Sequence, residues 1–326
     1  MQILMSEAAH ARVRERLAAM GDDLDVVTLD ADGIARRGSE VVDRASIDPE
    51  VYWASLDLFG QAPVLFQQIF GGTRGKWIQA FVAGLDNPVF ARIMAKGLRL
   101  TKSSAQAAAI AEYVMCNALS LLNAIAERQD AQARHDWRFL RFREVASTRW
   151  LIVGFGSIGH EIARRLAPFG AHLTVVRRDL APEAGVDEVC GSAALPRLLP
   201  AADVVVLACA LNNETRGIAG PAFFETMKPG AVLINIARGA LVDEAALQAG
   251  LGRDQPAHAV LDVFQTEPLP ADSWLWDHPK VRLSAHCSNA GDGVVARGDA
   301  LFLENLRRYR AGEPLLNEAR PSEVGL

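Results

Sequence analysis

Short, nearly continuous apolar runs alternate with helical patterns from residue 150 onward. The runs are rich in β-branched residues and occupy residues 150–154, 172–176, 203–209, 231–236, 258–264 and 280–286. Strands of this kind are buried on both faces, as in a parallel sheet that helices cover on both sides. The second half of the chain is therefore predicted to be a doubly wound α/β domain.

The region before residue 150 is built similarly but less regularly, with apolar runs at residues 23–29, 51–56 and 76–81. Residues 104–128 are rich in Ala and Leu and contain neither Gly nor Pro, which predicts one long helix leading from the first lobe into the second. Residues 290–310 predict a second long helix that crosses back. We therefore expect an α/β fold of two Rossmann-like lobes with doubly wound parallel sheets. In it a cofactor domain, residues 113–289, is inserted into a substrate domain, residues 1–112 and 290–326.

Composition limits the kinds of ligand and compartment. A chain of 326 residues, half of them hydrophobic, has room for two domains, and its net charge of -5 gives no overall attraction to nucleic acid or anionic lipid. The four cysteines are scattered without a CxxC pair or metal-ligand spacing, so we expect buried thiols in a reducing compartment and no metal site. No apolar run is long enough to span a bilayer, and a cytoplasmic protein without a membrane partner is expected.

A glycine-rich loop follows the apolar run that starts at residue 150. It contains Gly154, Gly156 and Gly159 and leads into an amphipathic segment, with Ser157 and Ile158 inside the loop. In a dinucleotide site such glycines make the tight turn, let the backbone approach the pyrophosphate, and allow the helix to pack closely on the strand. A purely structural turn is the alternative. The strand before the loop and the helix after it favour the cofactor site.

Two arginines follow the next apolar run. An NAD site usually has Asp or Glu about 20 residues after the glycines to bind the ribose 2′-hydroxyl, whereas this chain has Arg177 and Arg178 there. Guanidinium groups form charge-assisted bonds with a 2′-phosphate, so NADP is the predicted cofactor. The alternative is that both arginines are solvated surface charges and that the neighbouring Asp179 turns inward to favour NAD.

Further motifs carry a family resemblance. They are "NIARGALVDEAAL" at 235–247, "LDVFQTEPLP" at 261–270 and "LWDHPKVRLSAH" at 275–286, and "QAFVAGLDNPVF", "AAIAEYV" and "NNETRGI" occur in the expected order before them. In combination they closely resemble the D-isomer-specific 2-hydroxyacid dehydrogenase family, in particular its glyoxylate/hydroxypyruvate reductases. The resemblance covers nearly the whole chain.

The resemblance implies a catalytic set: Arg238 binds the substrate, Glu267 orients a histidine, and His286 is the acid/base. The chemistry of the side chains agrees. Reduction of a keto group needs a proton donor, and imidazole titrates in a suitable range. A carboxylate beside the imidazole fixes its tautomer, and a planar guanidinium can bind a carboxylate. The alternative for Arg238 is a salt bridge with Asp243 or Glu244.

The resemblance also implies binding residues outside the catalytic set. Ala83, Gly84 and Leu85 lie in the loop whose backbone N–H groups hold the substrate carboxylate, although Gly84 can equally serve only the turn. Asp262 matches the family aspartate near the nicotinamide, and Thr215 matches the threonine of a loop that lines the cofactor.

These features together predict an NAD(P)-dependent enzyme that interconverts 2-keto acids and D-2-hydroxy acids, with glyoxylate, hydroxypyruvate or a larger keto acid as substrate. NADPH is the preferred cofactor and NADH the alternative. The family implies a homodimer, and residues 134–143, which mix basic and aromatic side chains, lie where related enzymes have a subunit contact. Packing of this segment between the lobes is the alternative. The alternatives are a formate- or phosphite-type dehydrogenase and a dinucleotide-sensing module of corepressor type. Glu267 argues against the formate enzymes, which have glutamine there.

Overall fold

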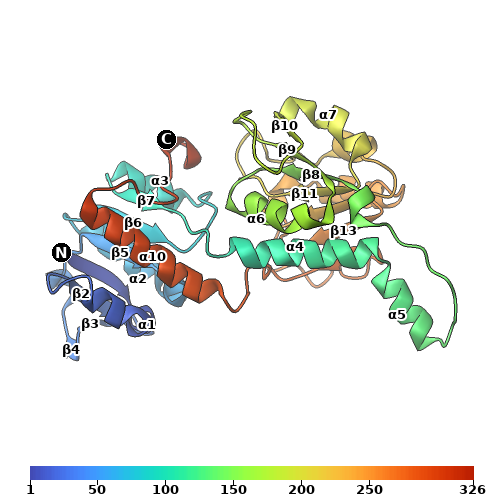
Figure 1. Cartoon of the computed structure of the whole chain (residues 1–326). Coiled ribbons are helices and arrows are strands. Elements are labelled where there is room, and N and C mark those ends of the chain that lie inside the picture. The colour runs from blue at the N-terminus through green and yellow to red at the C-terminus, as the bar shows by residue number, and fades with distance from the viewer. The chain divides into compact units, whose positions relative to one another are not determined.

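A computed structural model describes residues 1–326, apart from the side chain of Phe59. The chain divides into two compact units (Figure 1): the first comprises Met1–Gln106 and Asp292–Leu326, and the second Ala107–Gly291. The boundaries expected from the sequence were after residue 112 and before residue 290.

The first unit contains a seven-stranded sheet in the order β4-β3-β2-β1-β5-β6-β7. Its strands are β1 (Gln2–Ser6), β2 (Asp25–Leu29), β3 (Ala35–Arg37), β4 (Glu40–Val41), β5 (Val51–Ala54), β6 (Trp77–Ala80) and β7 (Arg99–Thr101). The strands from β2 through β1 and β5 to β7 pair in parallel. At the β2 edge, β3 and β4 extend the sheet as antiparallel strands, which the sequence analysis did not predict.

Helices cover both faces of this sheet. They are α1 (Glu7–Ala18), α2 (Ala62–Gly71), α3 (Pro88–Ala95) and α10 (Val294–Ala311). The side chains of α1 and α10 share one core, in which Val13 and Phe302 are fully buried, and α2 and α3 contribute Ile69 and Ile93 to the core on the other face. Because α10 completes the first core, this unit is built from both ends of the chain.

The second unit contains a seven-stranded sheet in which every strand pairs in parallel, in the order β10-β9-β8-β11-β12-β13-β14. The strands are β8 (Arg149–Val153), β9 (His172–Val176), β10 (Glu188–Cys190), β11 (Val204–Leu207), β12 (Val232–Asn235), β13 (His258–Leu261) and β14 (Val281–Leu283). Each of the six apolar runs found in the sequence overlaps one of these strands, and five of the runs contain their strand completely. Only β10, which is short and half-buried, was not predicted.

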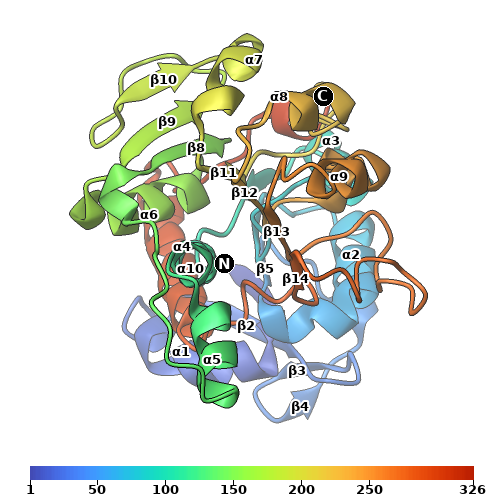
Figure 2. The same ribbon diagram turned by 90° about the vertical axis from the view of Figure 1, so that its right-hand side faces the viewer.

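This sheet is also doubly wound. On one face lie α4 (Ala107–Leu122) and α6 (Ser157–Leu166), and on the other α7 (Leu195–Leu198), α8 (Pro221–Thr226) and α9 (Glu244–Leu251), as Figure 2 shows. The first strand of the unit, β8, lies between β9 and β11, so the strand order reverses there. In open α/β sheets, ligands bind beyond the carboxyl ends of the strands at such a reversal.

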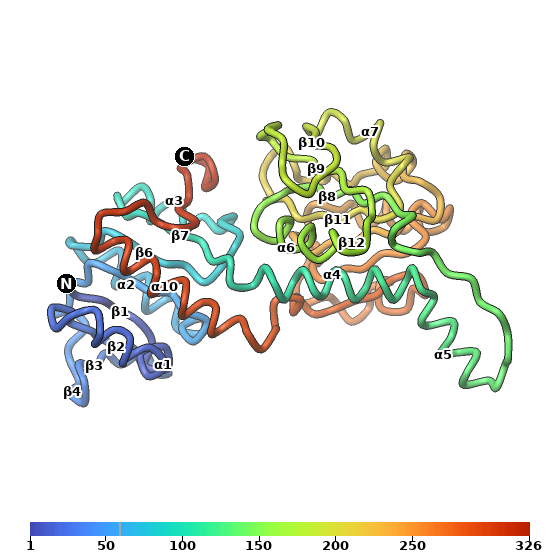
Figure 3. Tube along the Cα trace, in the orientation of Figure 1, coloured from blue at the N-terminus to red at the C-terminus, as the bar shows by residue number. Residues whose placement is uncertain are grey.

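The single long helix predicted over residues 104–128 is wrong. The chain forms α4, breaks at Ala124, whose backbone is left-handed (φ 51°, ψ 45°), and continues as α5 (Ile125–Ala133) at a bend of 57°. The carbonyl groups at the break find other donors, since Arg143 N–H donates to Leu122 O and the Arg128 side chain to Asn123 O. Figure 3 shows α5 and the chain after it extending away from the sheet of this unit.

Two further sequence expectations bear on α4 and on the thiols. Within the described residues no single helix is long and apolar enough to cross a membrane, although the bent pair α4 and α5 meets the length and composition test. The expectation of buried thiols is wrong for Cys116 and Cys287, which are exposed, whereas Cys190 and Cys209 are partly buried. Burial raises the pKa of Cys209 to about 11.

Candidate active site

The predicted site residues of the second unit share one structural position. Each follows directly the carboxyl end of a parallel strand or lies in the loop that the strand opens, and because the strands are parallel these ends lie along one edge of the sheet. They are Gly154, Gly156, Ser157, Ile158 and Gly159 after β8, Arg177 and Arg178 after β9, Thr215 after β11, Arg238 after β12, Asp262 and Glu267 after β13, and His286 after β14.

Each glycine of the loop after β8 has its own steric role. Gly154 has φ +95°, and a Cβ there would lie 2.4 Å from the backbone of Cys209, which follows the neighbouring β11. A Cβ on Gly159 would lie 2.8 Å from the ring of Phe155. A Cβ on Gly156 would meet nothing within 4 Å. Gly154 and Gly159 therefore permit close packing within the protein, whereas the space beside Gly156 is open.

The amino end of α6 completes this loop. Gly156 is its N-cap residue and offers no side-chain oxygen, so no side chain caps the first N–H groups, which belong to Ser157, Ile158 and their neighbours. Such groups, with the positive end of the helix dipole, bind phosphate. The open face at Gly156 and these N–H groups fit the pyrophosphate of a dinucleotide.

The two arginines after β9 lie in different environments. Arg177 donates to Asp179 O at 2.7 Å, to Ala181 O at 2.6 Å and to the Glu183 carboxylate at 2.8 Å, and only 15% of its side chain is exposed. This ion pair lowers the pKa of Glu183. Arg178 is exposed, and no partner of its side chain is found in the part of the chain that the structure describes. Asp179 accepts from Ala181 N–H at 3.0 Å, so its carboxylate stabilises the turn in which it lies.

A histidine and a carboxylate form the centre of the site. His286 Nδ1 lies 2.8 Å from Glu267 Oε2, and the second oxygen of Glu267 accepts from Phe264 N–H at 3.0 Å. Both side chains are partly exposed. Because Glu267 engages Nδ1 and is itself fixed to the backbone, the imidazole is oriented with Nε2 turned away from the carboxylate.

Asp262 lies beneath this histidine. Its side chain is almost fully buried, and its carboxylate accepts from Ser284 Oγ at 2.6 Å and from the N–H groups of Cys287 and Ser288 at 2.8 and 3.0 Å. Its carbonyl oxygen accepts from His286 N–H at 2.8 Å. The bonds that the structure gives to this carboxylate all run to the loop that contains His286. The prediction that Asp262 binds the cofactor stays untested.

Arg238 lies on a loop that is held tightly against the Glu267 loop. A Cβ on Gly239 would lie 1.9 Å from the carbonyl carbon of Phe264, so only glycine allows these two backbones to come so close. Asn235, at the end of β12, donates to Arg238 O at 2.9 Å. Arg238 Nη1 donates to the carbonyl of Ala237, which is one of the contacts of this side chain.

The two acidic residues that were the alternative partners of Arg238 have other roles. Asp243 caps α9 by accepting from Ala246 N–H at 3.0 Å, and Glu244 accepts from Gln265 N–H at 3.0 Å. The second bond links α9 to the loop between β13 and Glu267. These carboxylates therefore help to fix the loops around Arg238 and Glu267.

Thr215 closes the loop after β11. Its hydroxyl donates to Ala210 O at 2.7 Å and accepts from Asn212 N–H at 2.9 Å. The structure thus shows a positioning contact for this side chain within its own loop. Contact with a cofactor remains a prediction.

The predicted substrate loop belongs to the first unit and follows β6. Ala83 and Gly84 are half-buried and Leu85 is buried, where its side chain joins the core beside α3. The structure assigns no acceptor to their three N–H groups among the described residues. Consecutive free N–H groups of this kind can bind a carboxylate.

Comparison with known proteins identifies the family. Residues 115–288 match the model of the D-isomer specific 2-hydroxyacid dehydrogenase, NAD binding domain. The human glyoxylate reductase/hydroxypyruvate reductase is 30% identical over 259 residues, which cover 76% of this chain and 78% of that protein. The chain belongs to the D-isomer specific 2-hydroxyacid dehydrogenase family. It is therefore an oxidoreductase of the type that acts on CH–OH groups with a nicotinamide dinucleotide.

Two other comparisons add detail. The 4-methyl-2-oxopentanoate reductase A of Aspergillus oryzae is 40% identical over 157 residues, 48% of this chain and 47% of that protein, so the match spans about half the length of this curated relative. The fold is similar over nearly the whole chain to a D-isomer specific 2-hydroxyacid dehydrogenase from Xanthobacter autotrophicus Py2 in complex with NADPH and MES. The TM-score is 0.80 and the identity 27%, with 99% of both chains covered.

This geometry also depends on several residues that are not among the predicted site residues. Gly239 and Glu183 each fix a loop that contains a predicted site residue. Ser284 lies in the loop of His286 and donates to Asp262, and Tyr113 contacts this loop through Ser284. Gly239 could have been found, because a glycine directly after a predicted strand and a candidate arginine suggests a close backbone approach. The other three carry no local signal, since their partners are distant in the sequence or depend on the course of a loop.

Proposed function

We propose that the protein is an NADPH-preferring reductase that converts small 2-keto acids into D-2-hydroxy acids. The observation that carries the proposal is the contact of 2.8 Å between His286 Nδ1 and the Glu267 carboxylate. A bound nicotinamide dinucleotide supplies a hydride to the keto carbon. His286 holds the proton for the keto oxygen at Nε2, and Glu267 stabilises the imidazolium and keeps its orientation.

In the second unit, the Arg238 guanidinium is assigned to the substrate carboxylate. In the first unit, the N–H groups of Ala83, Gly84 and Leu85 are also proposed as carboxylate-binding groups. A guanidinium binds a carboxylate through two parallel hydrogen bonds, and it can also stabilise the charge that develops on the keto oxygen. Glyoxylate and hydroxypyruvate are the proposed substrates, with larger keto acids such as phenylpyruvate as the alternative. The names of the human and Aspergillus relatives include both a small and a branched keto acid.

The preference for NADPH is assigned to the two arginines in different ways. Arg178 is exposed and carries the free guanidinium that would bind the 2′-phosphate, whereas the donors of Arg177 are directed to its own loop. Arg177 therefore supports Arg178 rather than binding the phosphate itself. The Xanthobacter structure contains NADPH, which agrees with this assignment.

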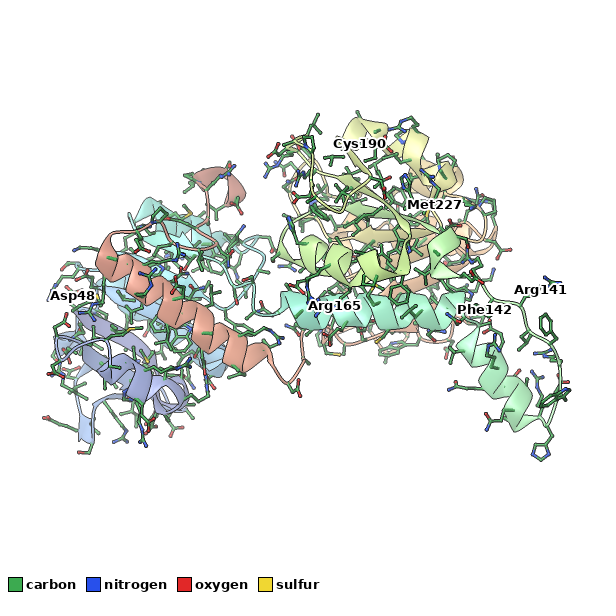
Figure 4. The ribbon with its side chains drawn as sticks, in the orientation of Figure 1. Asp48, Arg141, Phe142, Arg165, Cys190 and Met227 are labelled. Carbon is green, nitrogen blue, oxygen red and sulfur yellow. The ribbon has the colours of Figure 1, made fainter. Side chains whose placement is uncertain are left out.

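A homodimer is proposed through α5 and the segment after it. Trp137 and Phe139 are almost completely exposed in the single chain, and Phe142 is half exposed. Figure 4 labels Arg141 and Phe142 on this segment between α5 and β8. Exposed aromatic side chains mixed with arginines are typical of interface centres.

The first experiment measures initial rates of cofactor oxidation with glyoxylate, hydroxypyruvate, pyruvate and phenylpyruvate, each with NADPH and with NADH. Fast turnover with NADPH supports the proposal, and the best keto acid indicates the size of the pocket. His286→Ala should nearly abolish reduction while the affinity for NADPH stays near that of the wild type. Glu267→Gln should lower kcat by about 100-fold, in the range for general acid catalysis. Absence of turnover with either cofactor, despite cofactor binding, would favour a sensor.

A further inference from the structure

The backbone of His286 lies in a conformation that residues other than glycine seldom adopt. Its φ is +50°, in the left-handed region that disfavours residues with a Cβ. Residues in such conformations persist only where the surrounding structure fixes them, and they are concentrated at functional sites. The loop of His286 must therefore be held by contacts strong enough to maintain this backbone geometry.

Asp262 supplies those contacts. Its carboxylate is nearly inaccessible to solvent and accepts from Ser284 on one side of His286, and from Cys287 and Ser288 on the other. Its carbonyl accepts from His286 N–H. The loop is thus wrapped around one buried acidic residue, which fixes the chain directly before and after the histidine.

The chain of hydrogen bonds continues to α4. Tyr113 Oη lies 2.7 Å from Ser284 Oγ, which lies 2.6 Å from Asp262 Oδ1. Because the serine hydroxyl has one proton and gives it to the carboxylate, the tyrosine must be the donor in the first bond. Burial raises the pKa of Tyr113, which keeps the phenol protonated and able to donate. The proton donors therefore point in one direction, from Tyr113 through Ser284 to Asp262.

A second contact joins the same helix to the strand that leads to His286. Arg282, in β14, donates to Ser120 Oγ at 3.0 Å. Ser120 lies roughly two helical turns beyond Tyr113, so both contacts leave from one side of α4. The strand β14 is a short, half-buried edge strand, whereas α4 is anchored in the core by side chains such as Val114, which is fully buried. The helix is the rigid partner, and the edge strand is the one that needs support.

We infer that Tyr113 and Ser284 are positioning residues for His286: Tyr113 acts through Ser284 and Asp262 to hold the loop of the acid/base histidine in its left-handed geometry. Neither side chain acts on the substrate. The inference rests on the role proposed for His286 and extends it to a helix that supplies none of the predicted site residues.

Kinetics of conservative variants test the inference. Tyr113→Phe removes one hydroxyl and should lower kcat for keto-acid reduction about 5-fold, the effect of one ordinary hydrogen bond, while KM for NADPH changes less than about 2-fold. Ser284→Ala should lower kcat at least as much. The double variant should be no slower than Ser284→Ala alone, because Tyr113 acts only through Ser284. Ser284→Thr keeps the hydroxyl and should retain wild-type kcat.

Hydrogen exchange gives a readout that does not depend on turnover. The amides of residues 284–288 should exchange about 5-fold faster in Tyr113→Phe than in the wild type. Tyr309→Phe is the matched control, since this variant also loses one tyrosine hydrogen bond, the bond to Glu50 in the first unit. The control variant should leave kcat and the exchange rates of residues 284–288 unchanged.

The outcomes separate the inference from the proposed function. If the wild type reduces no keto acid, the proposed function is wrong, whereas the exchange rates still test whether Tyr113 holds the loop. Unchanged exchange in Tyr113→Phe overturns the inference. Faster exchange with wild-type kcat also overturns it, because Tyr113 would then stabilise the loop without positioning His286 for the reaction.

Discussion

Replacing Arg178 with alanine is expected to change the cofactor preference selectively. Arg178 is exposed, is the second residue after β9, and has no partner among the described residues, so its guanidinium can bind a 2′-phosphate without first giving up another contact. A hydrogen bond to a charged group contributes about 1.5 to 3 kcal/mol. Because the site is open to solvent, we expect KM for NADPH to rise about 10- to 100-fold. KM for NADH should change less than about 2-fold.

Arg177→Ala should behave differently, although the two residues are neighbours. The Arg177 side chain makes three hydrogen bonds within residues 177–183, one of them to the Glu183 carboxylate at 2.8 Å. Loss of the Arg177 side chain loosens the loop that both cofactors would contact, and it leaves Glu183 with only the longer contact of 3.6 Å to His160. KM for NADPH and for NADH should therefore rise by similar factors, about 3- to 10-fold, the effect of one or two weakened hydrogen bonds.

The assay is the initial rate of NADPH and NADH oxidation at saturating keto acid, with kcat and KM determined for each cofactor. Arg253→Ala is the matched control, because it removes the same charge from an exposed residue near the amino end of β13, at the opposite edge of the sheet. The reasoning is refuted if Arg178→Ala weakens both cofactors equally, or if Arg177→Ala is the selective variant.

Three further predictions follow from the packing and the exposed surfaces. Gly156→Ala should raise KM for both cofactors with little change in Tm, because its Cβ would meet no protein atom within 4 Å, whereas Gly239→Ala should lower Tm by several degrees and abolish activity, because its Cβ would lie 1.9 Å from a backbone carbon. Replacing Trp137 and Phe139 together by alanine should convert a dimer into monomers in analytical ultracentrifugation; a wild type that is monomeric at micromolar concentration would contradict the proposed interface. With its pKa raised to about 11, Cys209 remains a thiol at pH 8 and should be alkylated by iodoacetamide well after the two exposed cysteines, and labelling at the same rate would contradict its burial.

The apolar pattern was enough to predict the second sheet, because strands buried on both faces have few polar residues. Weakly buried elements left no such signal: β10 is only three residues long and half-buried. The break at Ala124 could not be predicted from propensity, since alanine favours the helix interior. The break depends on tertiary contacts, in which the carbonyl of Leu122 is bound by Arg143 from the returning chain.

The sequence was enough to predict where the site residues lie along the edge of the sheet, but not which groups their side chains contact. A residue that follows a parallel strand lies at the ligand-binding edge of the sheet, and this rule holds for Arg177, Arg238 and His286 alike. The rule does not say where a side chain at that edge points. Arg177 and Arg178 are adjacent in the sequence, yet Glu183 engages only the first of them.

Asp262 shows why the direction of a side chain matters for function. The family resemblance implies a role beside the nicotinamide, whereas the carboxylate accepts hydrogen bonds from the serine before His286 and from the two residues after it. A buried carboxylate that loses such donors costs free energy because it is left without hydrogen bonds. The positions of the donors around Asp262 are therefore tightly constrained. On the role proposed for His286, we expect a substitution of Asp262 to lower kcat through the position of the imidazole before it changes the affinity for the cofactor. Whether Asp262 faces the cofactor or the histidine loop depends on hydrogen bonds that join the end of β13, the loop after β14 and α4. These three segments are distant in the sequence and meet only when the chain folds.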